Sequence, residues 1–366
     1  MLSIFSKFPL SGLGRHLSRL VGFTRVELTE GSMALLKLLR GERVYKPPFW
    51  EPWFDMWEFF RKRYGDPGDV KNHIKMAKDL GMAALCIGYV DYLGGLRRYE
   101  ATRSGAVRYA GGCLTSLEQL RGLKPPDWGE LVERWRARRE AIRRAGLLTW
   151  VVLPWCFHAV ATAMGHANFF VKLYRDYEFV DGALEWVEEM NREAINTLVR
   201  EVKPDLVLFD GDCAYKSGLM VSPELLRKLV FDRTRETVSY LRRMGVPYAF
   251  HSDGRLYDLI PMLVELGFSM VHGCEKAAND LGYLVERFGD NIVLAGNMDV
   301  AFLAMATPEE VRRETVRTLT IGSSKGKFVA SCNTSPQDYI PEENYLAFVE
   351  AIRGFKPPEH ASEAGR

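Results

Sequence analysis

Histidine, carboxylate and cysteine side chains stand at the ends of three apolar segments in the second half of the chain. His251 and Asp253 close one segment, Glu275 follows the next, and Cys332 ends the last. Imidazole, carboxylate and thiolate groups are the side chains that bind zinc in proteins. These four residues therefore predict a divalent metal site, and such a metal turns a bound thiol into a thiolate nucleophile at neutral pH.

A second group of polar residues follows an earlier apolar segment and predicts a different chemistry. Asp210 and Asp212 close that segment, and Tyr215 and Lys216 come directly after them. Either aspartate could donate a proton or stabilise developing charge, while His251 and Lys216 bind an anion. The alternative that this group favours is a metal-free lyase or decarboxylase acting on a carboxylated substrate.

The same residues also fit purely structural roles. The segment from His251 to Gly254 fits a turn, in which Asp253 caps the next helix and Gly254 relaxes the backbone. Cys332 fits a small buried apolar side chain. Spacing alone leaves these alternatives open, because the chain has neither a CxxC nor an HExxH motif here.

The chain around these residues repeats a pattern of apolar run, turn and helix. Continuous apolar runs are typical of strands that are buried on both faces of a parallel sheet. Strand and helix in alternation predict right-handed crossovers and an α/β fold, here a (β/α)8 TIM barrel. The predicted strands are residues 49–54, 83–87, 147–153, 206–209, 248–251, 269–272, 292–295 and 328–331. The first of these is interrupted by Pro52.

Helix starts and domain boundaries complete this prediction. Ser222 and Thr307 each precede a proline and a glutamate, which is the pattern of a capped helix start.

We expect an N-terminal helical or flexible extension over residues 1–40, one barrel over 41–356 and a flexible tail over 357–366. Residues 91–146 are longer than a plain connection and predict an insertion beside the active-site mouth. Its arginine-rich helix, near 128–145, has either a solvated face or a face toward an anionic cofactor.

A barrel of this kind places its site at the carboxyl ends of the strands. Nearly every predicted strand ends in a polar residue, so we expect these residues to gather at one rim. Glu51 joins Asp210, Asp212 and Tyr215 as a candidate catalytic residue. Trp50, Lys216, Asn297 and Asn333 are candidates for cofactor binding, and aromatic residues would wall the pocket and exclude water. The walls predicted are Trp50, Trp53, Phe54 and Tyr215.

Composition limits the partners that the sequence favours. The 366 residues carry 49 basic and 47 acidic side chains, a net charge of +2 that gives no argument for nucleic acid or an anionic membrane. The six cysteines form no CxxC pair, which favours a reducing cytoplasm over a disulfide framework. No apolar run is long enough to span a membrane, and the N-terminus lacks the pattern of a signal peptide. We expect a cytoplasmic enzyme with a small-molecule substrate.

Three stretches resemble the uroporphyrinogen decarboxylase superfamily. They are LFDGDCAYKSGLMVSPELLRKLV at 208–230, the stretch 248–300 that begins YAFHSDGRLYDL, and FVASCNTSPQDYIPEENYLAFVEAIR at 328–353. The segment MGHANFF at 164–170 agrees more weakly. The resemblance implies a (β/α)8 barrel with its pocket at the strand ends, and one of two chemistries: decarboxylation without a cofactor, or zinc-dependent methyl transfer between corrinoid proteins and thiols.

Within this superfamily, the residues at the strand ends resemble those of the methylcobamide:coenzyme M methyltransferase branch rather than those of the true decarboxylases. The decarboxylases carry an arginine-rich motif for substrate carboxylates, whereas residues 47–54 here contain no arginine and do contain Glu51. The methyltransferases carry His-x-Cys and a later cysteine; His251 and Cys332 match, and Asp253 replaces the first cysteine. Glu275 matches the acidic ligand of cobalamin-independent methionine synthase.

The resemblance thus implies a divalent metal, zinc first, at His251, Asp253, Glu275 and Cys332. It also implies a corrinoid carried by a partner protein as methyl donor and a thiol-type acceptor. A homodimer is compatible with this interpretation. The remaining alternative is a scaffold that binds a corrinoid protein but has lost the chemistry, which predicts a shallow or filled barrel mouth.

Overall fold

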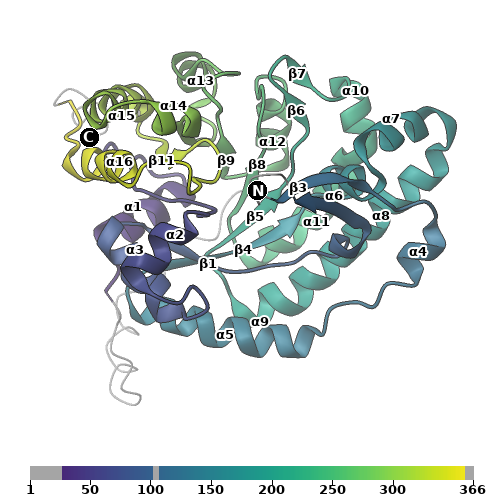
Figure 1. The fold of residues 1–366 in the computed structure, drawn as a ribbon. Helices are drawn as coiled ribbons and strands as arrows, with labels where there is room; N and C mark the ends of the chain where they lie inside the picture. The colour runs from purple at the N-terminus through teal and green to yellow at the C-terminus, as the bar shows by residue number, and fades with distance from the viewer. Residues whose placement is uncertain (1–26, 102–106, 359–366) are drawn as a thin grey trace, which may run out of the picture.

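The computed structural model describes residues 27–101 and 107–358, and its centre is a curled sheet of parallel strands. The strands follow one another in the sheet in chain order, β1-β4-β5-β8-β9-β10-β11, and helices surround them (Figure 1). This is the α/β TIM-barrel-like architecture that the alternating pattern predicts. The strands are β1 Ala84–Tyr89, β4 Leu148–Pro154, β5 Leu206–Asp210, β8 Tyr248–His251, β9 Met270–Gly273, β10 Val293–Met298 and β11 Phe328–Cys332.

The eighth strand, predicted over 49–54, is reduced to a single bridging residue. Phe49 forms parallel bridges to Met82 on one side and Ala330 on the other, so it connects the two ends of the sheet. The Trp50 N–H donates to the Ala330 carbonyl at 3.0 Å, and the Ala83 N–H donates to the Phe49 carbonyl at 2.7 Å. Pro52 lacks a backbone donor and ends this pairing. The prediction of a full strand here was wrong, although the position in the barrel was right.

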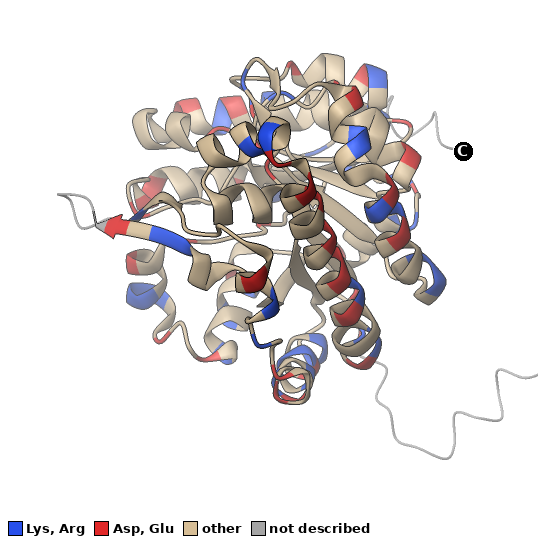
Figure 2. Ribbon diagram, turned by 90° about the vertical axis from the view of Figure 1, so that its right-hand side faces the viewer, with Lys and Arg blue, Asp and Glu red and all other residues tan. Residues whose placement is uncertain are grey.

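The helices lie outside the sheet, and their predicted starts are confirmed. Ser222 and Thr307 both accept backbone hydrogen bonds as N-caps, each with proline at the start of the helix. Acidic and basic side chains are interspersed over these helices (Figure 2). The helices are α1 Glu30–Leu39, α2 Trp57–Tyr64, α3 Val70–Leu80, α4 Leu117–Arg121, α5 Trp128–Arg144, α6 Cys156–Met164, α7 His166–Arg175, α8 Tyr177–Ala194, α9 Arg200–Val202, α10 Pro223–Leu226, α11 Asp232–Met244, α12 Ile260–Leu266, α13 Leu281–Phe288, α14 Val300–Met305, α15 Pro308–Gly322 and α16 Glu342–Gly354.

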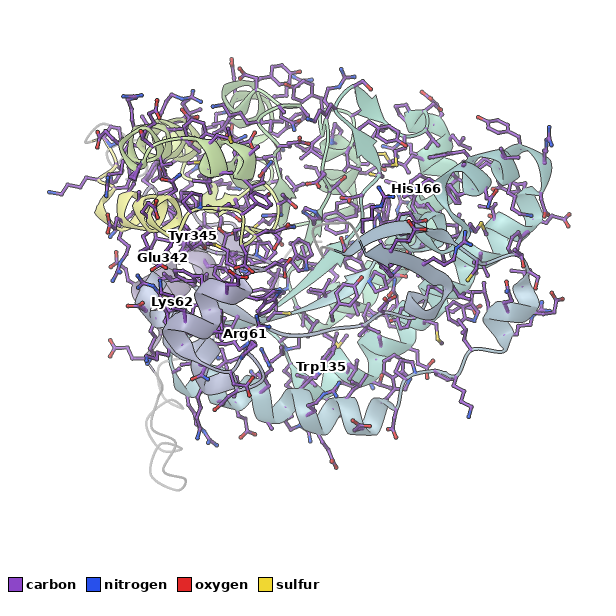
Figure 3. All side chains as sticks on the ribbon, viewed as in Figure 1. Arg61, Lys62, Trp135, His166, Glu342 and Tyr345 are labelled. Carbon is purple, nitrogen blue, oxygen red and sulfur yellow. The ribbon has the colours of Figure 1, made fainter. Side chains whose placement is uncertain are left out.

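The predicted insertion over 91–146 divides into two parts. The first part is a β-hairpin of β2 Arg97–Ala101 and β3 Val107–Gly112. The second part, α5, is the barrel helix between β1 and β4 and not an element of the mouth. Trp135 on α5 (Figure 3) packs so closely on β1 that a Cβ at Gly88 would lie 2.1 Å from the indole ring. This contact fixes α5 against the outside of the barrel.

The arginines of α5 mostly bind neighbouring protein groups rather than an open face. Arg136 pairs with Glu201 at 2.8 Å, and the Arg139 Nε–H donates to the Lys203 carbonyl at 2.7 Å. These contacts support the interpretation of a structural, partly solvated helix face. Arg138 is different, because its terminal nitrogens have no hydrogen-bonding partner among the described residues.

Within the described part of the chain, none of the helices combines the length and the apolar character that crossing a bilayer requires.

Candidate functional site

Two aspartates and one histidine converge where β5 and β8 end. β5 and β8 pair in parallel with Asp210 opposite His251, so the residues that follow each strand leave the sheet side by side. Asp212, His251 and Asp253 each present one ligand atom, and these three atoms lie within 4.8 Å of one another. His251 Nε2 lies 3.7 Å from Asp212 Oδ1 and 3.9 Å from Asp253 Oδ1. We call these three residues the Asp–His–Asp group.

The backbone around this group is held in a tight turn. The Asp253 N–H donates to Asp212 Oδ1 at 2.9 Å, and the Ser252 hydroxyl accepts from the Cys213 N–H at 3.2 Å. Gly254 has φ +85°, and a Cβ there would lie 2.6 Å from the Ala214 backbone. The helix-capping alternative for Asp253 is not observed, because α12 begins later, at Ile260.

A second buried histidine sets the orientation of His251. The two Nδ1 atoms of His251 and His272 lie 2.8 Å apart, and His272 Nε2 lies 3.1 Å from the Cys332 carbonyl. A carbonyl only accepts, so His272 Nε2 carries the proton and its Nδ1 accepts from His251. Burial lowers the pKa of His272 well below its usual value, so this ring is neutral. In neutral His251 the Nε2 lone pair therefore points toward the two aspartates.

One carboxylate oxygen of the Asp–His–Asp group has no hydrogen-bond partner within the described part of the chain, and the pKa values of the two aspartates are shifted in opposite directions. Asp253 Oδ1 is buried and has no hydrogen-bond partner among the described residues. The pKa of Asp253 is raised to about 6: burial is the main cause, His251 opposes the rise, and the nearby carboxylates of Asp212 and Glu275 contribute to it. Burial also acts to raise the pKa of Asp212, but His251, His158 and the Asp253 N–H hold it below its usual value.

Glu275 lies outside the Asp–His–Asp group, although the sequence predicts it as a ligand. Its Oε2 accepts from the Gly254 N–H at 3.2 Å, and its Oε1 lies 3.6 Å from Lys216 Nζ. Lys216 is largely exposed, whereas the Glu275 side chain is mostly buried. Glu275 therefore supports the turn after His251 and pairs with Lys216 in this structure.

Cys332 also lies outside the group, which departs from the predicted four-residue metal set. It belongs to a separate cluster with Glu51 and Ser331, which we call the Glu51 group. The Ser331 hydroxyl donates to Glu51 Oε2 at 3.0 Å, and the Cys332 N–H reaches both Glu51 oxygens at 3.2 Å. Burial raises the pKa of the Cys332 thiol well above its usual value, and the Glu51 charge adds to this shift. Without a metal beside it, the thiol is therefore protonated at neutral pH.

Glu51 itself is a buried acid rather than an open catalytic carboxylate. Its side chain is almost fully buried. Burial raises the pKa of Glu51 to about 8, and the hydrogen bonds from Cys332 and Ser331 oppose that rise only in part.

The other predicted residues have different surroundings. The Asn297 amide donates to the Cys274 carbonyl, and Asn333 Oδ1 accepts from the Val300 N–H at 3.2 Å, so both support loops. Tyr215 is half-exposed in a small hairpin of β6 Ala214–Tyr215 and β7 Gly218–Leu219. Asp210 Oδ2 lies 3.4 Å from the Tyr89 hydroxyl.

Of the predicted wall residues, Trp53 is the one that contacts the Asp–His–Asp group. Its ring centroid lies 4.6 Å from that of His251 in an edge-on arrangement. Trp50 is fully buried and packs against Trp150 and His272, at centroid distances of 5.3 and 5.7 Å. Phe54 packs instead against Tyr345, at 5.6 Å.

Sequence reasoning did not single out His272 and His166 as site residues. His272 pairs with His251 in the register of β8 and β9, and two neighbouring runs that both end in histidine were the available signal. His166, labelled in Figure 3, begins α7 and contributes to the field at Asp212 together with His158.

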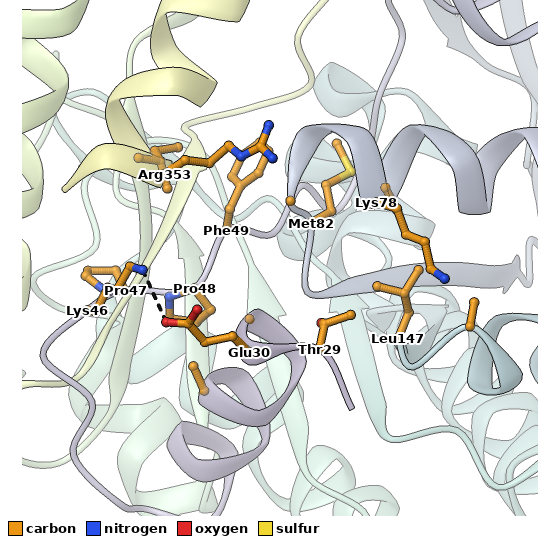
Figure 4. A pocket seen from close by; sticks show the side chains of 16 residues that line it. Thr29, Glu30, Lys46, Pro47, Pro48, Phe49, Lys78, Met82, Leu147 and Arg353 are labelled. Atoms are coloured by element: carbon orange, nitrogen blue, oxygen red, sulfur yellow. Dashed lines mark hydrogen bonds and ion pairs between the residues drawn. The ribbon is translucent and has the colours of Figure 1, made fainter. Parts of the chain in front are cut away.

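A further hollow lies at the opposite end of the barrel, where the strands begin. Figure 4 shows it between α1, the segment 46–49 and the start of β4, with a volume of about 410 Å³. Lys46 and Glu30 pair across it at 3.1 Å. Barrel enzymes carry their chemistry at the other end, so this hollow does not belong to the site.

The fold and the strand-end group together define a barrel with its candidate site at the carboxyl ends of the strands. The family model for uroporphyrinogen decarboxylase (URO-D) matches residues 114–355. The chain therefore belongs to the uroporphyrinogen decarboxylase family, and this family membership confirms the resemblance.

Individual relatives are more distant than the family match. A uroporphyrinogen decarboxylase from Alkalilimnicola ehrlichii is 24% identical over 62% of this chain and 62% of its own length. One from Vibrio campbellii is 24% identical over 68% of this chain and 70% of its own length. The chain thus spans less than two thirds of the first of these curated relatives.

A solved structure shares the fold over nearly the whole described chain. A methyltransferase from Methanosarcina mazei superposes with a TM-score of 0.70, at 18% identity, covering 89% of this chain and 99% of that one. At this level of identity the likeness establishes the fold and leaves the reaction to be argued from the site.

Proposed function

We propose that this protein is a metal-dependent methyltransferase that moves a methyl group from a corrinoid on a partner protein to a thiol. The observation that carries the proposal is the Asp–His–Asp group, in which one imidazole and two carboxyl groups face one another at the ends of β5 and β8. The fold shared with the Methanosarcina methyltransferase is compatible with this reaction.

The donor set fits a divalent cation. Asp253 Oδ1 is buried without a partner, and His251 Nε2 lies beyond hydrogen-bond distance of both aspartates. A bound cation would occupy the position between them and would neutralise two nearby carboxylates. One imidazole and two carboxylates make a harder site than the thiolate set implied by the resemblance, so zinc and manganese are both candidates.

When bound, the cation supplies a Lewis acid that lowers the pKa of an acceptor thiol. The protein contributes orientation and exclusion of water. His272 keeps the proton of His251 on Nδ1, so that Nε2 remains available at the site. Trp53 covers one side of His251 and limits access of water there. In the transfer the thiol loses its proton, a carbon–sulfur bond forms, and the donor keeps the electron pair of the bond that breaks.

The proposal is tested by single-turnover methyl transfer from methylcobalamin to a thiol, with 2-mercaptoethanesulfonate as the probe. The visible spectrum of the corrinoid reports loss of its methyl group. We expect turnover by metal-loaded wild-type protein and none by Asp253→Asn, with Glu309→Gln, at an exposed acid on α15, as a surface control that retains activity. Turnover that is equal in Asp253→Asn and wild type would contradict the proposal.

Decarboxylation is the second candidate, and the curated relatives favour it by name. Asp210 or Asp212 would then act as proton donor or as electrostatic stabiliser. The density of carboxylates at this rim opposes a polycarboxylate substrate, because Asp212 and Asp253 already lie close together. Release of carbon dioxide from a panel of carboxylates, abolished by Asp210→Asn, would support decarboxylation.

A further inference from the structure

The short eighth strand leaves space in the side of the barrel, and a cavity of about 290 Å³ occupies it. The cavity lies between residues 51–57 on one side and β1, β4, α3 and α5 on the other. It exists because the backbone pairing of Phe49 with Met82 ends before Pro52, where the chain diverges from β1. We call it the side cavity.

Aromatic side chains form a third of the lining of the side cavity. Trp53, Phe54, Trp57, Tyr89 and Trp150 all contribute to its wall. Its volume is near the lower end of the range for small-molecule sites, about 300–1,000 Å³. A planar ring fits such walls, because aromatic groups gain most from edge and offset contacts with one another.

A cationic side chain without an anionic partner also lines this cavity. The Arg138 Nε–H donates to the Cys86 carbonyl at 3.1 Å, and no carboxylate of the described residues forms an ion pair with the guanidinium. Partial burial lowers the pKa of Arg138, but a guanidinium keeps its charge in proteins. A half-buried cation of this kind is stabilised by a carboxylate that binds two of its N–H groups.

Trp150 supplies a second, independent sign of a ligand. The indole is 2% exposed and lines the side cavity, yet its Nε1–H has no hydrogen-bond partner among the described residues. A buried donor without an acceptor is unfavourable unless a ligand or water satisfies it.

The acidic groups of the lining are already engaged elsewhere. The Asp55 carboxylate accepts from the Ser335 hydroxyl at 2.8 Å, and Glu51 accepts from Ser331 and Cys332. His73 Nε2 lies 2.7 Å from the Pro67 carbonyl and donates to it. Arg138 therefore remains as a cation without an anionic partner in this lining, and Trp150 as a buried donor without an acceptor among the described residues.

We infer that the side cavity binds a small aromatic carboxylate, with its ring against Trp53 and Trp150 and its carboxylate at Arg138. Trp53 lines the side cavity and also contacts His251, so this one residue connects the cavity to the Asp–His–Asp group. The role of this ligand as a substrate rests on the proposed function, whereas its binding does not.

Isothermal titration calorimetry of the full-length protein with benzoate tests the inference. The titration uses chelator-treated, metal-free protein and is repeated with one equivalent of zinc, so that failure of the metal proposal is distinguishable from failure of this one. Two comparison ligands are used. Benzyl alcohol has the aromatic ring but lacks the charge, and cyclohexanecarboxylate has the charge but lacks the aromatic ring. We expect saturable binding of one benzoate, with both comparison ligands roughly tenfold weaker.

Substitutions of Arg138 and Trp150 test which side chains bind the carboxylate and the ring of benzoate. Arg138→Gln is expected to weaken benzoate binding roughly tenfold or more and to leave benzyl alcohol unchanged, because only the carboxylate contact is lost. Arg138→Lys should restore part of the affinity, and Trp150→Phe should lower it several-fold without filling the cavity. Arg134→Gln, on the exposed face of the same helix, is the matched control and should bind as wild type does.

The measured affinities for benzoate either support or overturn a binding site at Arg138. Absence of saturable benzoate binding to folded wild-type protein would overturn it, as would equal affinity in Arg138→Gln and wild type. If thermal unfolding shows that Arg138→Gln is unfolded, Arg138→Lys and Trp150→Phe carry the test, and unchanged affinity in both would overturn it. Binding that depends on Arg138 in metal-free protein supports it even if no metal binds.

Discussion

The Asp–His–Asp group and the Glu51 group lie at the same rim of the barrel and contain similar side chains, yet they are suited to different tasks. In the first, His251 Nε2 and Asp253 Oδ1 lack hydrogen-bond partners among the described residues. In the second, the Glu51 carboxyl takes hydrogen bonds from Ser331 and from the Cys332 backbone. Ligand capacity therefore depends on which polar atoms remain unpaired, and residue type alone does not determine it.

His272 connects the two groups. One of its nitrogens lies 2.8 Å from His251, and the other lies 3.0 Å from the Ser331 hydroxyl. The Glu51 group thus supports the ring that orients His251, as outer-shell partners do for metal ligands. Substitutions in each group distinguish a metal-binding role from a structural one.

The largest effect is expected from His251→Ala. This change removes the imidazole of the Asp–His–Asp group, so we expect the affinity for zinc to fall by more than roughly a hundredfold. Competition against a chromophoric chelator measures the affinity. Cys332→Ser, which alters the Glu51 group instead, is the control and should retain affinity close to that of wild type.

A smaller loss of metal affinity is expected from His272→Phe. Phenylalanine preserves the packing against Trp50 but cannot accept the proton of His251, so His251 loses its fixed tautomer. We expect affinity to fall by about 10- to 100-fold. An unchanged affinity in folded His272→Phe would show that the imidazole pair has only a packing role.

Glu51→Gln should change how stability depends on pH. Burial raises the pKa of Glu51 to about 8 from 4.5, so the folded state prefers the protonated acid. Its stabilising contribution is complete below about pH 4.5 and is lost as the pH rises through about 8. Between pH 6 and 9 we expect the Tm of Glu51→Gln to fall less than that of wild type.

Thermal unfolding at several pH values measures this difference. Glu309→Gln, a substitution at an exposed glutamate at the start of α15, is the control and should follow the wild-type pH dependence. Parallel Tm curves for Glu51→Gln and wild type would mean that Glu51 is already ionised in the folded protein.

The smallest effect is expected from Lys216→Ala. Lys216 is 71% exposed and lies 3.6 Å from Glu275, and exposed ion pairs of this kind contribute about 0–1 kcal/mol. Urea unfolding should therefore change by less than about 1 kcal/mol. A larger loss, or a loss of metal, would assign Lys216 and Glu275 to the site.

Much of the fold could be predicted from the sequence because its signals are local. The apolar runs after residue 80 coincide with strands, and Ser222 and Thr307 start helices as predicted. The eighth strand and the position of α5 were harder. The position of α5 depends on the packing of Trp135 on Gly88, which joins distant parts of the chain, and no local sequence pattern predicts this contact.

The sequence places the residues of the candidate site at the strand ends, but it does not reveal which of them lie together. His251 and Asp253 end β8, and Asp212 joins them because β5 is the neighbouring parallel strand. The hydrogen bonds between Glu51 and Cys332 connect residues at opposite ends of the chain. Such a pairing follows from barrel closure and is not visible in the spacing of residues around Cys332.

The metal content of the full-length protein shows whether the Asp–His–Asp group holds a divalent cation. After loading with zinc or manganese and extensive dialysis, elemental analysis should find about one equivalent of divalent metal in wild type and in Cys332→Ser, and almost none in Asp212→Asn or His251→Ala. Wild-type protein that retains no metal, or loss of metal in Cys332→Ser with retention in His251→Ala, would contradict the account.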